Sequence, residues 1–280
     1  MKPELWKFPE RDADPASELW LPEDASAPAP AIVLAPDLLG RPGHGLASAL
    51  GPELAKRGFV TLAAAPTAGC DTPRFKEATL RERVGDVARA VTALFERMAA
   101  AGKVDIRKIA LVGHGVGGTV AIAEAAHDSR VGAVAAIGAP RSPAGYFAKK
   151  DVAAWQKGAS AALRDAATGE EHELGPELWR DWKARESELD HANGATKTDA
   201  HVLWVHGTDD EQVAVDDSRR AYWKHPEAGR RARLVEIAGA KHDFGVAADP
   251  SAHGAELSPQ ARRLADAVAD MLETAFPKKS

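Results

Sequence analysis

The stretch that most constrains this chain is residues 109–118, which read IALVGHGVGG. An apolar run of strand length passes directly into a glycine-rich turn, and an apolar segment of helical length follows over residues 116–127. A buried strand that enters a tight glycine turn and leaves as a helix is typical of parallel α/β folds. The stretch therefore predicts a sharp strand–turn–helix unit whose tightest point lies at Gly115.

The rest of the chain repeats this alternation of strand-like and helical patterns. Short apolar runs predict strands over residues 31–35, 59–64, 131–137, 201–205 and 234–237. Apolar residues at helical spacing predict helices over residues 46–57 and 81–101, and a last helix after Ser258-Pro259. This order predicts the α/β class, with a mostly parallel sheet and helices on both faces, and ligands at the carboxyl ends of its strands.

Composition limits the binding partners and the cellular compartment that we expect for this protein. A net charge of −5 gives no reason to expect nucleic acid or an anionic membrane as partner. The single cysteine, Cys70, excludes an internal disulfide, and no apolar stretch reaches the roughly 18 residues of a membrane span. The acidic, proline-containing N-terminus does not read as a signal peptide. We expect a cytoplasmic protein, and the sequence leaves its oligomeric state open.

The glycine turn resembles the nucleophile elbow of the α/β-hydrolases, whose motif is G-x-S-x-G. The motif glycines are present at Gly113 and Gly117, but Gly115 stands at the nucleophile position. Because glycine has no side chain, it cannot attack a substrate. The resemblance extends from about Ala31 to Phe276 and implies an α/β-hydrolase fold as a single domain over residues 1–280.

Two later loops resemble the loops that carry the acid and the histidine of this family. The sequence GTDDEQV after the run 201–205 places the acid at Asp210, and GAKHDF after the run 234–237 places the histidine at His242. In the family the acid orients the imidazole while the histidine moves protons. The alternative for the first loop is an acidic surface turn, and the alternative for His242 is an exposed loop histidine.

The turn PDLLG after residues 31–35 stands where the family places part of its oxyanion hole. The resemblance implies that the backbone N–H groups of Leu38 and Val116 are the oxyanion donors. Asp37 matches the position of a carboxylate that contacts the nucleophile in dienelactone hydrolases, and the alternative is that it caps the next turn. Because of this short loop with its acid, the chain resembles the dienelactone hydrolases within the family.

The segment from about 141 to 200 is charged, lacks strand-like runs and corresponds to the family's cap, so we expect a helical cap insertion there. Its aromatic residues are expected either to line a substrate pocket or to anchor the cap helices to the core. These residues are Tyr146, Trp155, Trp179 and Trp182.

The resemblance implies hydrolysis of a small carboxylic ester or lactone, with no organic cofactor and no metal. Gly115 leaves three interpretations open. In the first interpretation, Gly115 replaces a natural serine or cysteine. In the second, the protein is a non-catalytic member that binds a ligand or partner. In the third, His242 held by Asp210 activates water directly, with water in the space beside Gly115.

Three other readings of the sequence remain open. Gly113, Gly115 and Gly118 also satisfy the dinucleotide-binding fingerprint G-x-G-x-x-G, although no acid stands where a ribose ligand is expected. The cluster His206, Asp209, Asp210 and Glu211 offers metal ligands by type. Cys70 offers a thiol as a relocated nucleophile.

Overall fold

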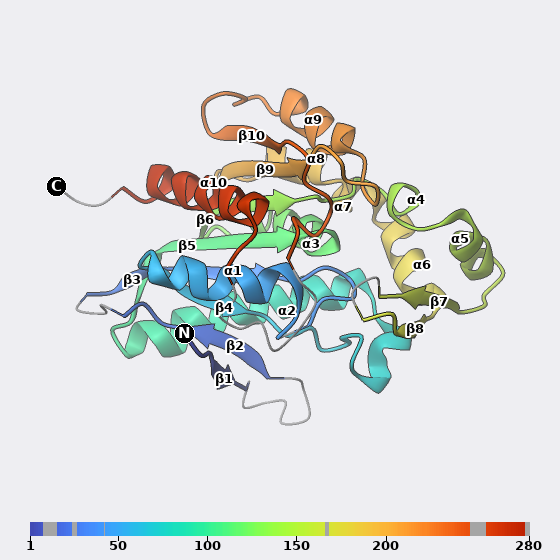
Figure 1. The fold of residues 1–280 in the computed structure, drawn as a ribbon, viewed down its shortest axis with the longest axis horizontal. Helices are drawn as coiled ribbons and strands as arrows, with labels where there is room; N and C mark the ends of the chain where they lie inside the picture. The colour runs from blue at the N-terminus through green and yellow to red at the C-terminus, as the bar shows by residue number, and fades with distance from the viewer. Residues whose placement is uncertain (8–15, 24–26, 42, 166–167, 247–255, 278–280) are drawn as a thin grey trace.

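The computed structural model describes residues 1–7, 16–23, 27–41, 43–165, 168–246 and 256–277. In these residues the chain forms an eight-stranded sheet in the order β1-β2-β4-β3-β5-β6-β9-β10 (Figure 1). Its strands are β1 (Glu4–Trp6), β2 (Ser17–Trp20), β3 (Ala29–Ala35), β4 (Val60–Ala63), β5 (Val104–His114), β6 (Val131–Ile137), β9 (His201–Gly207) and β10 (Ala232–Ile237). Every pair from β4 to β10 is parallel, and β1 and β2 add an antiparallel edge.

The central strands are buried on both faces because each carries an unbroken apolar run. In β3, Ala31, Val33 and Ala35 pack into one core cluster, while Ile32 and Leu34 pack into the other. Because successive side chains of a strand point to opposite faces of the sheet, β3 contributes to the apolar layers on both sides. This burial on both sides confirms the fold class that the alternating pattern predicts.

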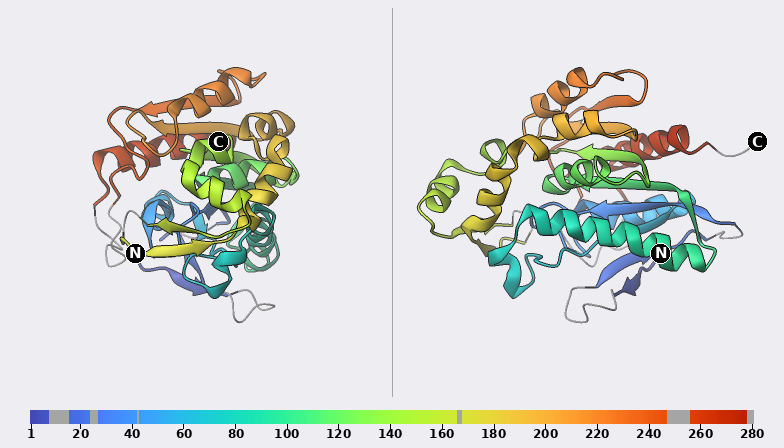
Figure 2. Two further views of the ribbon diagram at one scale, coloured as in Figure 1. Left: turned by 90° about the vertical axis from the view of Figure 1, so that its right-hand side faces the viewer. Right: turned by 180° about the vertical axis from the view of Figure 1, so that it is seen from behind.

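Helices cover both faces of the sheet. The helices α1 (Gly45–Lys56) and α10 (Pro259–Ala275) pack on one face, in front in Figure 1. On the opposite face lie α2 (Leu80–Ala93) and α3 (Val116–Ala125), with α2 in front when the molecule is seen from behind (Figure 2). The helix α9 (Val215–Lys224), which the sequence did not predict, contacts β9 and β10.

Residues 141–200 project beyond the carboxyl ends of the strands (Figures 1 and 2). They form α4 (Pro143–Tyr146), α5 (Lys149–Gln156), α6 (Pro176–Ala184), α7 (Glu186–Leu189), α8 (His191–Gly194) and the short η3 (Ala195–Lys197). The segment is not wholly helical, since β7 (Ala161–Arg164) and β8 (Glu171–Leu174) pair as an antiparallel hairpin. The hairpin corrects the expectation of a segment without strands.

Two further boundaries differ from those predicted. The strand before the elbow begins at Val104, and the long helix predicted over 81–101 is α2 followed by a π-helical turn, η2 (Leu94–Met98). A short 3-10 helix, η1 (Pro73–Glu77), precedes α2. Within the described ranges, no helix combines the length and apolarity needed to cross a membrane. Most of the acidic N-terminal stretch, residues 8–15, lies outside the described residues.

Candidate active site

The elbow between β5 and α3 depends on three glycines. Gly115 has φ +54° and ψ −124°, a conformation that residues with a Cβ rarely adopt. A Cβ on Gly113 would lie 2.1 Å from the carbonyl oxygen of Gly117, and a Cβ on Gly117 would lie 2.2 Å from that of Ala35. The motif glycines therefore let β5, the N-terminus of α3 and the end of β3 approach closely.

Asp210 and His242, which follow β9 and β10, form a hydrogen-bonded pair. Asp210 Oδ2 lies 2.8 Å from His242 Nδ1. The other carboxylate oxygen, Oδ1, accepts the backbone N–H groups of Gln212 and Val213 at 2.9 and 2.8 Å. Since these N–H groups hold the carboxylate in place, Asp210 fixes one orientation of the imidazole and leaves Nε2 directed away from it.

The carboxylate of Asp37 occupies the space beside Gly115. A Cβ built on Gly115 would lie 2.1 Å from Asp37 Oδ1 and 2.3 Å from Asp37 Cγ. The backbone N–H of Val116 donates to Asp37 Oδ1 at 2.7 Å, and His242 Nε2 lies 3.3 Å from Asp37 Oδ2. Asp37 therefore contacts the two groups that, in a hydrolase elbow, would face the nucleophile and its oxyanion.

The three side chains form a charged chain, Asp210–His242–Asp37. Burial alone would lower the pKa of His242, but its hydrogen bonds to Asp210 and Asp37 raise that pKa to about 10. Burial would raise the pKa of Asp37, but the hydrogen bond and the charge of His242 hold it well below its usual range. At neutral pH His242 is therefore an imidazolium between two carboxylates.

Tyr146, at the end of α4, covers this carboxylate from the cap side. Its hydroxyl lies 3.0 Å from Asp37 Oδ1 and 2.9 Å from Asp37 Oδ2. The ring contacts Phe147 and Trp182, whose centroids lie 4.9 and 6.4 Å away. Of the four cap aromatics that the sequence singled out, Tyr146 is the one with a polar contact to the site.

The cap tryptophans behave mainly as anchors. Trp155 and Trp182 are fully buried, and Trp155 Nε1 donates to the carbonyl oxygen of Leu174 at 3.0 Å. Phe147 packs edge-on against both rings. Trp179 is partly buried and packs against the same core cluster. These contacts favour the anchoring interpretation for Trp155 and Trp182.

Arg83 supports the turn that follows β3. Its side chain is buried and reaches from α2 to the carbonyl oxygens of Leu38 at 2.7 Å and Asp37 at 3.4 Å. Of the two predicted oxyanion donors, Val116 points its N–H at the Asp37 carboxylate, and Leu38 is the residue that follows Asp37 in the chain. The sequence did not single out Arg83, because a lone arginine on a helix gives no signal.

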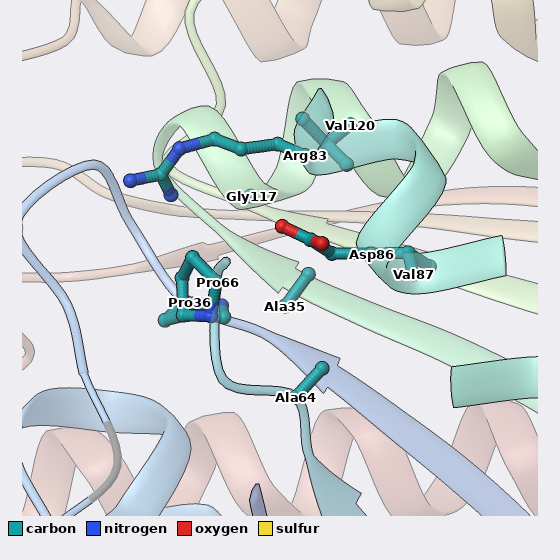
Figure 3. Close-up of a pocket in the computed structure, with 9 residues that line it drawn as sticks. All are labelled: Ala35, Pro36, Ala64, Pro66, Arg83, Asp86, Val87, Gly117 and Val120. Carbon is teal, nitrogen blue, oxygen red and sulfur yellow. The ribbon is translucent and has the colours of Figure 1, made fainter. Parts of the chain in front are cut away.

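A small cavity lies behind the elbow, between α2, α3 and the end of β3. Its volume is about 10 Å³, close to the least that admits one water molecule. Figure 3 shows Arg83 and Asp86 reaching toward it beside Pro36, Pro66 and Gly117. The cavity is too small for an organic substrate, so it is a small gap in the packing behind the site and not a substrate pocket.

The metal cluster that the 206–211 loop offers by ligand type is only partly assembled, since His206 Nε2 lies 3.3 Å from Asp210 Oδ2 but the other two members stand apart. Asp209 and Glu211 are exposed, and the ring nitrogens of His206 contact Ser218 Oγ at 2.7 Å and the Val213 carbonyl oxygen at 3.0 Å. A different group offers ligand atoms within 4.8 Å of one another: Asp37, His114 and His242.

His114 is only partly suited to bind a metal ion. Its Nε2 lies 2.8 Å from the carbonyl oxygen of His242, and the two imidazole rings stack with centroids 4.5 Å apart. Burial, together with the charge of His242, lowers the pKa of His114 to about 4. His114 is therefore neutral at pH 7 and fixes the backbone of the histidine loop.

Cys70 has the properties of a structural thiol. Its Sγ donates to the carbonyl oxygen of Leu39 at 3.1 Å, and burial raises its pKa, which disfavours the reactive thiolate. The thiol stabilises the turn after β3, next to the site.

Comparisons with known proteins agree with this architecture. A family model described as PET hydrolase-like matches residues 14–158, and a model described as putative esterase matches residues 91–264. No curated protein sequence matches the chain.

Several solved structures share the fold. The structure of a DcsB complex with its substrate analogue has a TM-score of 0.70 at 17% identity, covering 93% of this chain and 95% of that chain. Est1E from Butyrivibrio proteoclasticus has a TM-score of 0.69 at 16% identity, covering 99% and 100%. A putative dienelactone hydrolase from Klebsiella pneumoniae has a TM-score of 0.57 at 17% identity, covering 94% and 93%. At these identities the likeness shows the fold alone.

Proposed function

This chain belongs to the α/β-hydrolases of the PET hydrolase-like and putative esterase families, and on that premise we propose that it hydrolyses a small carboxylic ester or lactone. The observation that carries the proposal is the chain of contacts from Asp210 through His242 to the carboxylate beside Gly115. Asp37 contacts both His242, the proposed proton carrier, and Val116 N–H, the oxyanion donor that the family resemblance implies, which supports the proposal.

His242 serves as the proton carrier of the proposed reaction, and Asp210 orients it. A hydrolysis needs a proton for the leaving alcohol and a base for the attacking water. Because its pKa is raised to about 10, His242 begins the cycle protonated and supplies the proton for the leaving alcohol. No organic cofactor or metal is required by these steps.

A structural neighbour and the cap together narrow the choice of substrate. Est1E, which shares this fold, has also been solved with ferulic acid bound. In this chain a phenolic acid of that size would have to enter between Tyr146 and the elbow, since Tyr146 covers the Asp37 carboxylate. We propose that the cap, residues 141–200, forms one wall of this entry within a single domain.

A second function, a non-catalytic ligand-binding protein, is favoured by the occupied space beside Gly115. The Asp37 carboxylate lies where a water molecule would have to lie for direct attack, so water activation there requires Asp37 to move. A protein held in this state would bind carbonyl ligands without turning them over.

The test is a panel of esters and lactones assayed on this chain, on Gly115→Ser and on His242→Ala, with folding checked by circular dichroism. Turnover by the unchanged chain that disappears in His242→Ala supports the proposal. Turnover by Gly115→Ser alone supports the non-catalytic protein. If folded samples of both the unchanged chain and Gly115→Ser remain inert on the whole panel, the site assignment is wrong.

A further inference from the structure

We propose that the Asp37 carboxylate is itself the nucleophile of this site, supplied from the end of β3 instead of from the elbow. The inference rests on the proposed ester hydrolysis and names the group that attacks. In the described residues, Asp37 is the carboxylate that combines contact with the proton carrier and contact with the elbow N–H.

The first argument is the place of the carboxylate. Its atoms lie within 2.1 to 2.7 Å of the point where a Cβ on Gly115 would stand, which is closer than any two unbonded atoms can pack. Asp37 and a side chain at position 115 therefore exclude each other. The absence of a side chain at Gly115 is what allows the carboxylate to enter the elbow.

The second argument is the set of partners. An elbow nucleophile is held near the N–H of the next residue and the imidazole of the catalytic histidine. Asp37 contacts both: Val116 N–H donates to one oxygen at 2.7 Å, and His242 Nε2 lies 3.3 Å from the other. The carboxylate thus has the surroundings of the missing side chain.

The third argument is the protonation state. A serine needs a base to remove its proton, whereas carboxylates attack as anions and form covalent intermediates without prior deprotonation. The pKa of Asp37 lies below its usual range, so the group is ionised at neutral pH. His242 is protonated in the same state, which suits an acid that protonates a leaving group.

The steps balance in atoms and protons. An Asp37 carboxylate oxygen attacks the carbonyl carbon of the ester, the bond from that carbon to the alcohol oxygen breaks, and His242 Nε2 gives its proton to the departing oxygen. The product is a mixed anhydride with a neutral His242. Water then attacks the acyl carbon, His242 takes the proton of the water, and Asp37 leaves as the carboxylate.

The same chemistry selects the substrate. Asp37 is a weak base, so the tetrahedral intermediate expels the alcohol oxygen instead of Asp37 only when that oxygen is also weakly basic, as in an acidic phenol, and His242 protonates it as it leaves. Alkyl esters, whose alkoxides are strongly basic, would return to starting material from the first step. The substrate class that fits Asp37 is therefore an aryl ester or another ester with an acidic alcohol component.

Access to the carboxylate is controlled by Tyr146. Its hydroxyl contacts both carboxylate oxygens, and its ring is anchored against Phe147 in the cap. A substrate must displace this hydroxyl before Asp37 can attack. Until then the Tyr146 hydroxyl holds the carboxylate in one orientation. Asp37 would therefore already be oriented when the substrate carbonyl takes the place of the hydroxyl.

The experiment measures hydrolysis of a p-nitrophenyl ester by the unchanged chain, Asp37→Asn, Asp37→Ala and Gly115→Ser. Asp37→Asn keeps the shape and an acceptor for Val116 N–H but is no nucleophile. Asp199→Asn, which changes a fully exposed carboxylate, is the matched control. Both Asp37 variants should lose about 100-fold or more in kcat, while the control keeps its activity.

Added formate tests whether a free carboxylate in the place of Asp37 restores activity, and the acyl group found on Asp37 distinguishes a nucleophile from a positioning residue. Formate fits the space left in Asp37→Ala and should restore activity about 10-fold, but it should not act on Asp37→Asn, whose amide fills that space. Activity that formate restores, together with no acyl group on Asp37 of the unchanged chain, assigns Asp37 to positioning His242 and overturns the inference. Undiminished or increased activity in Asp37→Ala overturns it as well, because Asp37 would then be an obstacle.

The outcomes separate this inference from the proposed function. If the unchanged chain is inert and Gly115→Ser is active, Asp37 is not the nucleophile but the site is that of a hydrolase. If both are inert, the proposed function itself fails.

Discussion

Replacing Gly115 with alanine should destabilise the fold through two effects that can be separated. The first is local, because φ +54° and ψ −124° is a strained conformation for a residue with a Cβ, costing on the order of 1–3 kcal/mol. The second is the displacement of Asp37, since the new methyl group would lie 2.1 Å from Oδ1. That displacement breaks the hydrogen bond from Val116 N–H, worth about 1.5–3 kcal/mol for a charged acceptor.

The two effects together predict a loss of about 2.5–6 kcal/mol in the free energy of unfolding. In an Asp37→Ala background no carboxylate is left to displace, so Gly115→Ala should then cost only the backbone strain. The double variant should therefore be more stable than the sum of the single changes implies, by about 1.5–3 kcal/mol.

Chemical denaturation of the four proteins of this cycle measures the coupling energy. Additive effects within about 0.5 kcal/mol would show that Asp37 and the position of a Cβ at residue 115 do not compete. In that case the carboxylate does not occupy the elbow, and the assignment of its contacts is wrong.

The remaining predictions concern the groups around this pair. His242 has a folded pKa of about 10 against 6.5, so its stabilising effect is complete below pH 6.5 and is lost as pH rises through 10. Asp210 and Asp37 both raise this pKa, so thermal melts of Asp37→Asn should keep the Asp210 part of the pH dependence and lose the Asp37 part. Arg83→Met should lower kcat about 10-fold with little change in KM, since the Leu38 carbonyl loses its donor. Tyr146→Phe should speed the reaction of small aryl esters several-fold by uncovering Asp37, measured in the same p-nitrophenyl assay. Zn²⁺ should inhibit by binding Asp37 and His242, and a chelator should restore activity without affecting untreated protein.

The sequence predicted the sheet well because its central strands are continuous apolar runs. β6, over residues 131–137, has the predicted bounds, and β3 begins two residues before the run that predicted it. The hairpin β7–β8 escaped prediction because its strands are short and mostly exposed, and β8 reads EHEL. Such strands are specified by pairing with each other and by the contact of Leu174 with Trp155.

The sequence also placed the site residues at the correct strand ends, and the structure brings Asp37, Gly115, Asp210 and His242 together there. Their catalytic roles stay predictions. The position of the Asp37 side chain could not be predicted, because it depends on how closely the end of β3 approaches the elbow. Arg83 and His114 were missed as site residues for the same reason, since each acts through a contact far away in the chain.

Mass analysis of the acylated protein decides whether Asp37 reacts with substrate. The protein is mixed with an excess of an aryl ester, quenched in acid within the first turnover, digested and searched for the mass of the acyl group. The acyl group is expected on the peptide that contains Asp37, in the unchanged chain but not in Asp37→Asn. Turnover of the ester without any acylated peptide containing Asp37, or acylation of a different residue, would show that Asp37 is not the nucleophile.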